Sequence, residues 1–355
     1  MPEPGAPCTF WLARLLHRQL LSMSALRVPG YDENSALRIT TDIHGLERVA
    51  PAGTVVHSFS ASRYPSLWKR RLRLLLAALA SDHLVIHFSL PDAIWFAAAL
   101  TLIPFRRCRI TTLDFFVGDP RGWRLKLASW SLRRIDRMLV YFKDSSVFQR
   151  QFGIPASRFY YIPFKINGIE LIEKATPSDR GYIFCGGRSR RDFATLFAAV
   201  APLGYPVKVV TSPEAEMLPH GSSMAGLKVP PNVEVSTNDR SPAFFVETMA
   251  AARLVVIPIV RDSTTQAGIG VYLQAMALGK CVIVSHSLGV SDVLTDQEAI
   301  LVPPGDPLVL REAIERAWND DALLSRYGSR ALEYARSLGG EDALRRSVLA
   351  ALPYY

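Results

Sequence analysis

The chain has 355 residues, of which 49% are apolar and 21% are charged, a composition typical of a folded globular protein. This length suffices for two domains of ordinary size. The first residues include an acid and two prolines, which is not typical of a signal peptide, and no run of about eighteen apolar residues predicts a membrane-spanning helix. Four cysteines lack CxxC spacing, which favours small buried residues over a zinc site or disulfides: Cys8, Cys108, Cys185 and Cys281. We expect a cytoplasmic protein, soluble or peripheral to a membrane.

The charge is unevenly distributed along the chain. Residues 1–175 hold 24 Lys and Arg against 13 Asp and Glu, a net charge of +11, whereas residues 176–355 hold 17 against 19, a net charge of −2. A strongly basic half indicates that this half faces something anionic.

Apolar runs in the first half predict strands separated by helices. The expected strands cover residues 55–59, 84–88, 108–113, 138–142 and 159–162. The expected helices cover residues 67–80, 93–102, 123–135 and 145–152. A polar, irregular stretch at 165–179 is interpreted as a linker.

The second half alternates strands and helices more regularly. The expected strands cover residues 181–185, 206–211, 232–236, 254–259, 281–285 and 299–302. The expected helices cover residues 193–201, 242–252, 270–278, 307–318 and 321–337. Strands that are apolar throughout and alternate with helices indicate a parallel sheet covered on both faces, as in Rossmann-like domains.

The expected fold class is therefore α/β, with two Rossmann-like domains that face each other across a cleft. We predict one domain at residues 1–170 and a second at 171–337, with a C-terminal helix within 338–355 that packs back on the first domain. Doubly wound sheets bind ligands at the carboxyl ends of their strands, so the cleft is the expected binding site.

A glycine-rich loop before the helix at 270–278 is the strongest candidate for ligand binding. The hydroxyl residues 263–265 and then Gln266 lead to Gly268 and Gly270, where backbone N–H groups can approach a phosphate at the helix N-terminus. Gln274 follows four residues after Gly270 on the same helix face, within reach of ribose hydroxyls. A tight loop without a ligand is the alternative interpretation of the two glycines.

Residues 266–279, with the sequence QAGIGVYLQAMALG, resemble the donor-binding motif of retaining GT-B glycosyltransferases of family four, the glycosyl transferases of group 1. That motif has two glutamates with seven residues between them, followed by Ala-Met-Ala. The downstream segment ILVPPGDP also fits, and the resemblance covers most of residues 179–337. It implies that the second domain binds a nucleotide-sugar donor through Gly268, Ile269 and Gly270. It also implies transfer without a metal or a bound cofactor, and no Asp-x-Asp motif is present.

Both glutamates of the motif are glutamines here, at Gln266 and Gln274. The resemblance implies that the first contacts the donor sugar and the second the ribose. A carboxylate accepts through two oxygens, whereas an amide offers one acceptor and one donor group. Bonds to charged groups contribute about 1.5–3 kcal/mol and neutral ones about 0.5–1.5 kcal/mol, so donor binding would be retained but weaker.

A second motif, GGRSRRDF, follows the expected strand at 181–185. Arginines between two glycines and a helix can pair with a diphosphate and neutralise it as a leaving group. The family has Gly-Arg and a nearby Lys at this place. We therefore assign Gly187 and Arg188 to donor binding and Arg191 to the place of the Lys, while Arg190 is expected to be solvated. A solvated basic turn is the alternative.

The acceptor side is less well defined. The strand that ends before Asp114 matches a stretch where many family members have Val-His-Asp, but Leu113 stands at the position of the His. The resemblance implies that the donor phosphate can act as the base, so Asp114 is the acceptor-side candidate and a capping or turn role is its alternative. His87 ends a neighbouring expected strand, and a lone histidine is more often structural.

Three basic stretches at 10–26, 67–76 and 121–137 interleave Trp, Leu, Arg and Lys. Such helices can lie on an anionic membrane, although a buried apolar face with a solvated basic one is the alternative for each helix. No sequence motif for nucleic-acid binding accompanies the charge.

We therefore predict a hexosyltransferase that moves a sugar from a nucleoside-diphosphate sugar to a hydroxyl acceptor on a lipid-linked or polysaccharide precursor, with retention, at the inner face of the plasma membrane. A non-catalytic GT-B-like scaffold subunit of a membrane-associated glycan assembly is the first alternative, and a sugar-nucleotide epimerase is the second.

Overall fold

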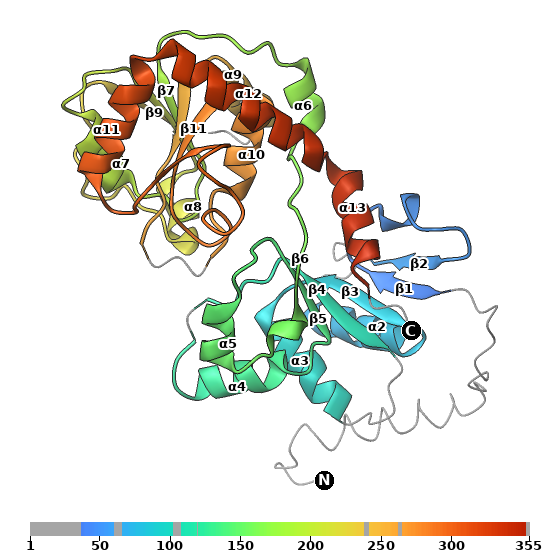
Figure 1. Ribbon diagram of the computed structural model, residues 1–355. Helices are drawn as coiled ribbons and strands as arrows, with labels where there is room; N and C mark the ends of the chain where they lie inside the picture. Colours follow the sequence, from blue (N-terminus) through green and yellow to red (C-terminus); the bar gives the residue numbers. More distant parts are fainter. Residues whose placement is uncertain are drawn as a thin grey trace, which may run out of the picture. The chain divides into compact units, whose positions relative to one another are not determined.

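The computed structural model describes residues 37–59, 66–101, 108–118, 120–237, 241–261 and 265–352 (Figure 1). The basic stretch expected at 10–26, Cys8 and the loop residues 263 and 264 lie outside the described residues. The other three cysteines are buried free thiols, as predicted.

The first sheet has six parallel strands in the order β2-β1-β3-β4-β5-β6. The strands are β1 (Arg38–Thr41), β2 (Val55–Ser58), β3 (His83–His87), β4 (Arg109–Leu113), β5 (Arg137–Val140) and β6 (Phe159–Tyr161). The helices between them are α2 (Leu67–Leu79), α3 (Leu90–Thr101), α4 (Trp123–Leu132) and α5 (Ser146–Phe152), with the short 3-10 helices η1 (Leu46–Arg48) and η3 (Ala156–Arg158).

The second sheet is also parallel and has the order β12-β11-β10-β7-β8-β9. Its strands are β7 (Ile183–Gly186), β8 (Val207–Thr211), β9 (Val233–Thr237), β10 (Leu254–Ile257), β11 (Cys281–Ser285) and β12 (Ile300–Val302). Its helices are α7 (Phe193–Val200), α8 (Glu214–Met217), α9 (Pro242–Ala250), α10 (Ile269–Ala277), α11 (Pro307–Trp318) and α12 (Asp321–Leu338), and η4 (Leu218–His220) follows α8.

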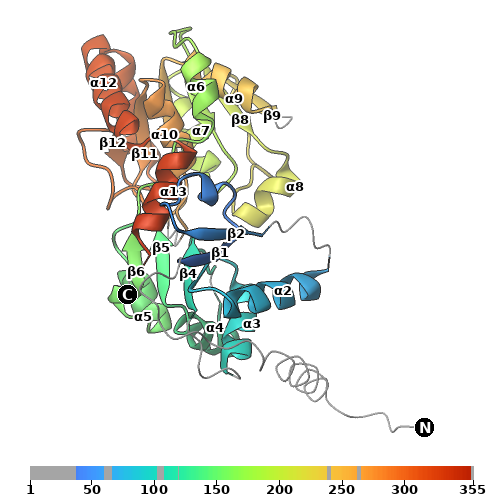
Figure 2. The same ribbon diagram turned by 90° about the vertical axis from the view of Figure 1, so that its right-hand side faces the viewer.

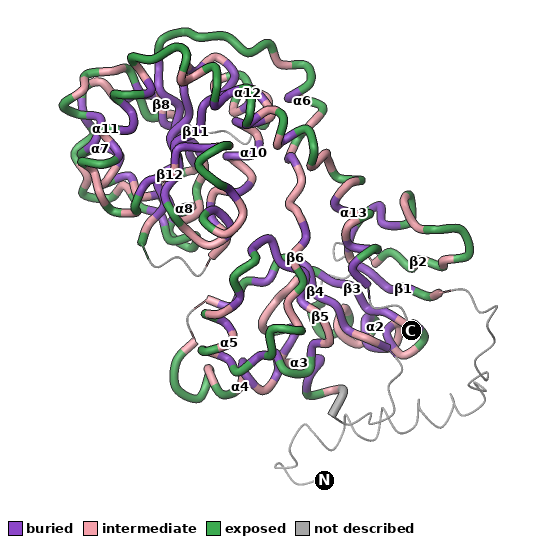
Figure 3. Tube along the Cα trace, in the orientation of Figure 1, coloured by how far each residue is buried: buried purple, intermediate pink, exposed green. Residues whose placement is uncertain are grey.

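The strands at the centre of the second sheet are buried along their whole length, and the central strands β3, β4 and β5 of the first sheet are buried except at one end residue each (Figure 3). Every residue of β7, β10 and β11 is buried, which is the pattern of strands covered by helices on both faces. Helix boundaries follow their capping residues: Asp306 accepts hydrogen bonds from the first turn of α11, and Asp320 does so for α12. The predicted α/β class with two Rossmann-like sheets is confirmed.

Among the described strands and α-helices, three were not predicted, which are β1, α6 and the short helix α8. Strand β1 was not expected, because its sequence RITT contains a single aliphatic residue, and its burial comes from pairing with β2 and β3. The stretch predicted as an irregular linker contains the helix α6 (Ile169–Lys174), which begins at Gly168 in the left-handed conformation (φ 63°). Six residues with one buried isoleucine give too little periodicity to predict a helix from the sequence.

The C-terminal helix α13 (Glu341–Ala350) lies against residues near β1 and β2 (Figures 1 and 2). The Nε of Arg345 donates to the carbonyl of His44 at 2.9 Å, and Arg137 at the start of β5 donates to the carbonyl of Ala351. All strands of the first sheet precede residue 170 and all strands of the second follow it. The domain boundaries at 170 and 337 themselves stay a prediction.

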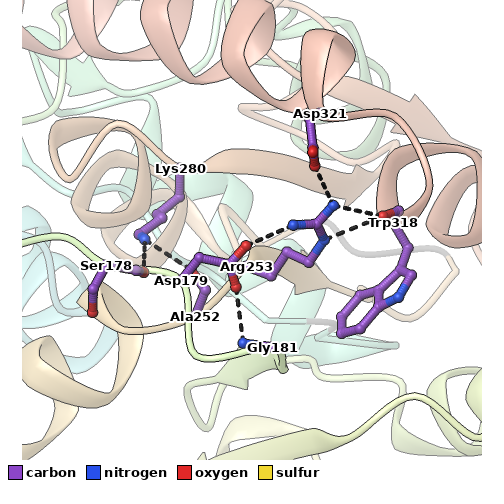
Figure 4. Close-up of polar contacts among 8 residues, drawn as sticks. All are labelled: Ser178, Asp179, Gly181, Ala252, Arg253, Lys280, Trp318 and Asp321. Carbon is purple, nitrogen blue, oxygen red and sulfur yellow. Dashed lines mark hydrogen bonds and ion pairs between the residues drawn. The ribbon is translucent and has the colours of Figure 1, made fainter.

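Two cations fasten the segment that leads into the second sheet (Figure 4). The buried Nζ of Lys280 donates to the carbonyls of Ser178 and Ala252 at 2.7 and 2.8 Å, and burial lowers the pKa of Lys280 to about 8. Arg253 pairs with Asp179 at 2.6 Å and donates to the carbonyl of Trp318. These bonds join the start of β7 to β10, β11 and the end of α11. In the described part of the chain, no helix is long and apolar enough to span a membrane.

Candidate donor-binding cavity

A cavity of about 320 Å³ opens at the carboxyl ends of strands from both sheets. Asp114 and Tyr141 directly follow β4 and β5, and Gly187 directly follows β7. The remaining lining residues come from the loop before α7, the segment after β6, α9 and the start of α10: Phe164, Asn167, Arg188, Ser189, Arg191, Phe245, Gln266, Gly268, Ile269, Gly270, Val271 and Gln274. Most lining residues from the second half were assigned to the donor from the sequence. Ser189, Phe245 and Val271 are the lining residues of that half that were not assigned.

Arg191 is the most unusual group in this cavity. Its side chain is buried, its Nε donates to the carbonyl of Gly186 at 2.7 Å, and its Nη1 donates to the carbonyl of Ser189 at 2.8 Å. Its own backbone N–H donates to the hydroxyl of Ser222 at 2.7 Å. These bonds fix the guanidinium in one orientation. No carboxylate of the described residues pairs with it, and burial lowers the pKa of Arg191 to about 10, so it remains a cation at neutral pH.

Packing around Arg191 requires a glycine at position 187. Gly187 has φ 97°, which disfavours any side chain, and a Cβ there would lie 2.6 Å from Nη2 of Arg191. Arg188 is half-exposed, and its nearest carboxylate is Glu216 at 3.7 Å. Arg190 packs its side chain near Gly221 and does not line the cavity. Arg188 and Arg191 thus place two cations at this wall of the cavity.

The N-terminus of α10 supplies a second source of positive potential. Gly268 precedes the helix in the left-handed conformation (φ 86°), and no side chain caps the helix there. The first N–H groups of a helix have no partner within it, and the helix dipole favours an anion at this end. Gly268, Ile269 and Gly270 all line the cavity, so the uncapped end faces the same space as Arg191.

Both glutamines of the motif line the cavity, and both side chains are already hydrogen-bonded. Nε2 of Gln266 donates to the carbonyl of Phe115 at 3.1 Å, while its Oε1 accepts from the N–H of Tyr141 at 3.1 Å. Nε2 of Gln274 donates to the carbonyl of Asn167 at 3.0 Å. Each amide retains a second N–H, and each oxygen a lone pair, for a ligand.

Asp114 reaches the cavity from the first sheet. It is a non-glycine residue with φ 65°, a strained conformation that is often found at functional sites. Its side chain is exposed to the solvent of the cavity, yet desolvation by the surrounding protein raises the pKa of its carboxyl, an effect that the nearby His87 opposes. His87 itself bonds Asp42, with Nδ1 and Oδ1 3.2 Å apart, and this bond raises the pKa of the imidazole.

The sequence did not identify six cavity residues, which are Tyr141, Phe164, Asn167, Ser189, Phe245 and Val271. Tyr141 and Phe164 form an edge-to-face pair with centroids 4.6 Å apart. Asn167 and Phe164 lie in the stretch that was interpreted as an irregular linker or just before it, where no periodicity marks them. Asn167 and Phe164 belong to the site because they lie close to Gly270 in the folded chain.

Solved structures of the same architecture define the class of fold. A glycosyltransferase from Rickettsia africae matches 88% of this chain and 97% of its own, with a TM-score of 0.63 at 12% identity. HepE from Anabaena in complex with UDP matches 89% and 100%, with a TM-score of 0.61 at 16% identity. Sucrose-phosphate synthase from Thermosynechococcus elongatus matches 85% and 84%, with a TM-score of 0.61 at 17% identity. The chain therefore has the predicted GT-B fold.

A family model supports the same class at the level of sequence. Residues 223–320 match the family described as glycosyl transferases group 1. This range contains β10, the glycine loop and α10, so the predicted resemblance is confirmed for this segment, whereas the loop after β7 lies outside the matched residues. The comparison with curated proteins gave no match.

Proposed function

We propose that this protein is a glycosyltransferase that binds a nucleoside-diphosphate sugar in the cavity and transfers the sugar to a hydroxyl acceptor. Arg191 carries the proposal, because a buried guanidinium without a carboxylate partner among the described residues calls for an anion. The uncapped N-terminus of α10 faces the same cavity. A diphosphate is a compact anion with oxygen acceptors, which suits both groups.

The proposed donor contacts follow from this placement. Arg188 and Arg191 neutralise the diphosphate as it leaves, and Gly187 leaves room for the guanidinium of Arg191. The backbone at 268–270 binds the phosphates. Oε1 of Gln274 accepts from a ribose hydroxyl, and the second N–H of Gln266 donates to the donor sugar. HepE is known in complex with UDP and with UDP-glucose, which supports a UDP-sugar as the first donor to test.

We propose that the transfer retains the anomeric configuration. The bond between the anomeric carbon and the diphosphate oxygen breaks, and the acceptor oxygen forms its bond to that carbon on the same face. The acceptor proton passes to the released phosphate oxygen. The two arginines and α10 supply the positive charge in this scheme, without a metal ion or a bound cofactor. Asp114, across the cavity on the first sheet, orients the acceptor hydroxyl.

The acceptor is proposed to be carried on a lipid or a polysaccharide at the inner face of the plasma membrane, with residues 1–170 as the acceptor domain and 171–337 as the donor domain. Trp68 lies in the first turn of α2 with 57% of its surface exposed, and Trp123 begins α4 with 69% exposed. Both helices follow strands of the first sheet along the chain, α2 after β2 and α4 after β4. Exposed basic residues on or beside these helices are Lys69, Arg73, Arg121, Arg124, Lys126, Arg133 and Arg134. Exposed tryptophan beside basic charge is typical of contact with anionic lipid.

Calorimetric titration with UDP-, GDP-, ADP- and TDP-sugars tests the donor site. We expect one nucleotide class to bind and Arg188→Ala to weaken it about tenfold, since a charge-assisted hydrogen bond contributes about 1.5–3 kcal/mol. Arg188 is half-exposed, so its removal should leave the fold intact. Arg190→Ala, in the same loop but outside the cavity, is the control and should bind as the wild type does. Failure of all four classes to bind would refute the proposal.

A non-catalytic scaffold subunit is the second candidate function. Leu113 at the position of the family's histidine, and the engagement of both glutamines with backbone atoms, favour it. A scaffold would bind the nucleotide without turnover in the presence of any acceptor. An epimerase would instead form a product from the donor alone.

A further inference from the structure

Gln266 joins the second sheet's cavity wall to two strands of the first sheet. Phe115, whose carbonyl accepts from its Nε2, lies just after β4, and Tyr141, whose N–H donates to its Oε1, lies just after β5. One side-chain amide therefore bridges the carboxyl ends of two strands that are more than a hundred residues away in sequence. The bridge uses both properties of an amide, because it donates at one atom and accepts at the other.

Gln274, which lies within α10, makes a similar contact with the segment that connects the sheets. Its Nε2 donates to the carbonyl of Asn167 at 3.0 Å. Asn167 packs directly on the first turn of α10, since a Cβ added to Gly270 would lie 2.7 Å from its Nδ2. The glycine and the glutamine thus accommodate the same asparagine from two positions on one helix.

A carboxylate could not make either contact to a carbonyl. The oxygens of Phe115 and Asn167 are acceptors, and an ionised glutamate has only acceptors, so each pair would face oxygen to oxygen. A buried carbonyl left without its donor costs about as much as a lost hydrogen bond. Asp114 lines the same cavity, so an ionised side chain at 266 would also add a like charge.

We propose that Gln266 and Gln274 are positioning residues that tie the donor-binding segment to the first sheet and to the connecting segment, and that each position requires a side chain that donates to a carbonyl. The two glutamines then represent an adaptation of the donor site, in which part of each amide holds the cavity walls together. The contribution of these hydrogen bonds to nucleotide binding rests on the proposed function, whereas their contribution to the stability of the unliganded protein does not.

The variant Gln266→Glu tests whether position 266 requires a hydrogen-bond donor. A protonated glutamate has the shape of the amide and, like it, one group that donates and one that accepts hydrogen bonds, whereas an ionised glutamate only accepts. Above the pKa of the new carboxyl we expect UDP to bind about tenfold more weakly and the unliganded protein to unfold at a lower temperature. The carbonyl of Phe115 favours the protonated form in the folded state, so the pKa of the carboxyl is raised by folding. The deficit is therefore present at high pH and is lost as the pH falls through that pKa.

The other ionisable groups at this cavity are Asp114 and Tyr141 on the first sheet and Arg188 and Arg191 in the loop after β7. They are present in the wild type as well, so the comparison is the difference between variant and wild type at each pH from about 5 to 8. Gln266→Met removes both hydrogen bonds and should show the same deficit at every pH. Gln149→Glu is the matched control, because its partner is the hydroxyl of Ser145, which can donate to a carboxylate instead.

Thermal unfolding without ligand tests whether the hydrogen bonds of Gln266 stabilise the protein, and titration with UDP tests whether they support nucleotide binding. A deficit of Gln266→Glu that recovers at low pH, with a constant deficit in Gln266→Met, supports the proposal. Wild-type stability of Gln266→Glu at pH 8, or a deficit that does not change with pH, would overturn it. If the stability of unliganded Gln266→Glu recovers at low pH but the wild type does not bind UDP, the positioning role of Gln266 would be supported and UDP as part of the sugar donor would be refuted.

Discussion

At the scale of single residues, the cavity depends on glycines that let backbone and charge come close. A Cβ on Gly268 would lie 3.1 Å from Ile259 and 3.2 Å from Ile257, in addition to the strain of φ 86°. Gly187 and Gly270 would place a Cβ against Arg191 and Asn167. The sequence identified Gly187, Gly268 and Gly270 because they precede helices after strands, which is a local pattern.

We expect Gly268→Ala to lower the free energy of unfolding by about 1–3 kcal/mol and to weaken UDP binding about tenfold, because the first turn of α10 must shift to relieve the contacts. Gly204→Ala is the control: its φ is 68° but nothing lies within 4 Å of the added Cβ. That variant should lose about 1 kcal/mol from backbone strain alone and bind UDP normally. Equal effects on UDP binding in both variants would contradict this account of Gly268.

Other residue roles could not be predicted, because their partners are distant in the sequence. The amide of Gln266 contacts backbone atoms of Phe115 and Tyr141, and no sequence pattern encodes backbone contacts over such separations. The same holds for Asn167, which enters the site from a stretch without periodicity. The position of Arg191 was predicted from its motif, but its burial was not, since the carbonyls of Gly186 and Ser189 that hold it become available only in the folded loop.

At the scale of elements, the strands of the second sheet were predicted almost residue by residue, because β7, β10, β11 and β12 are apolar runs and β8 and β9 are rich in valine. Strand β11 and helix α11 have the predicted limits. The first half was harder, since β1 has a single aliphatic residue and α6 has six residues in all. Short elements such as these are stabilised by their neighbours rather than by their own sequence.

The junction at Lys280 gives a prediction at this scale. Lys280→Met leaves the carbonyls of Ser178 and Ala252 without their donor and should destabilise the protein by about 2 kcal/mol at pH 7. The pKa of Lys280 falls from 10.5 to about 8 on folding, so between these values the unfolded chain binds a proton that the folded chain has lost. Wild-type stability therefore gains from rising pH in that window, and the deficit of the variant should grow from pH 7 to pH 10.

Thermal or urea unfolding of both proteins at each pH measures this difference. Lys208→Met is a suitable control, because Lys208 is partly exposed and its ion pair with Glu234 lies at the surface, where such pairs contribute little. A deficit at Lys280 that is constant or shrinks toward pH 10 would show that the buried amine does not titrate as proposed.

At the scale of the whole molecule, the strong positive charge of the first half suits an anionic surface. The structure separates the basic residues into two groups, however: Arg70 and Arg71 pair with the buried Asp92 at 3.0 and 2.7 Å, whereas Lys69, Arg124 and Lys126 are exposed. Part of the charge of α2 therefore stabilises its packing on α3.

We expect the protein to sediment with vesicles that contain phosphatidylglycerol and not with vesicles of phosphatidylcholine alone, and added salt should release it. Replacing Trp68 and Trp123 together by Ala should weaken binding about tenfold, since each loses buried apolar area at the interface. Phe244→Ala, an exposed aromatic residue on α9 of the second half, should bind as the wild type does. Equal binding to both kinds of vesicle would contradict an electrostatic attachment.

The central claim is that a nucleoside diphosphate binds between the loop after β7 and the N-terminus of α10. Hydrogen–deuterium exchange with and without saturating UDP locates that binding directly, because bound phosphates occupy backbone N–H groups and slow their exchange. The account predicts protection of the segments 187–191 and 268–274, and Arg188→Ala should need about a tenfold higher UDP concentration to reach the same protection. Protection confined to other segments, or none at concentrations where UDP binds, would contradict it.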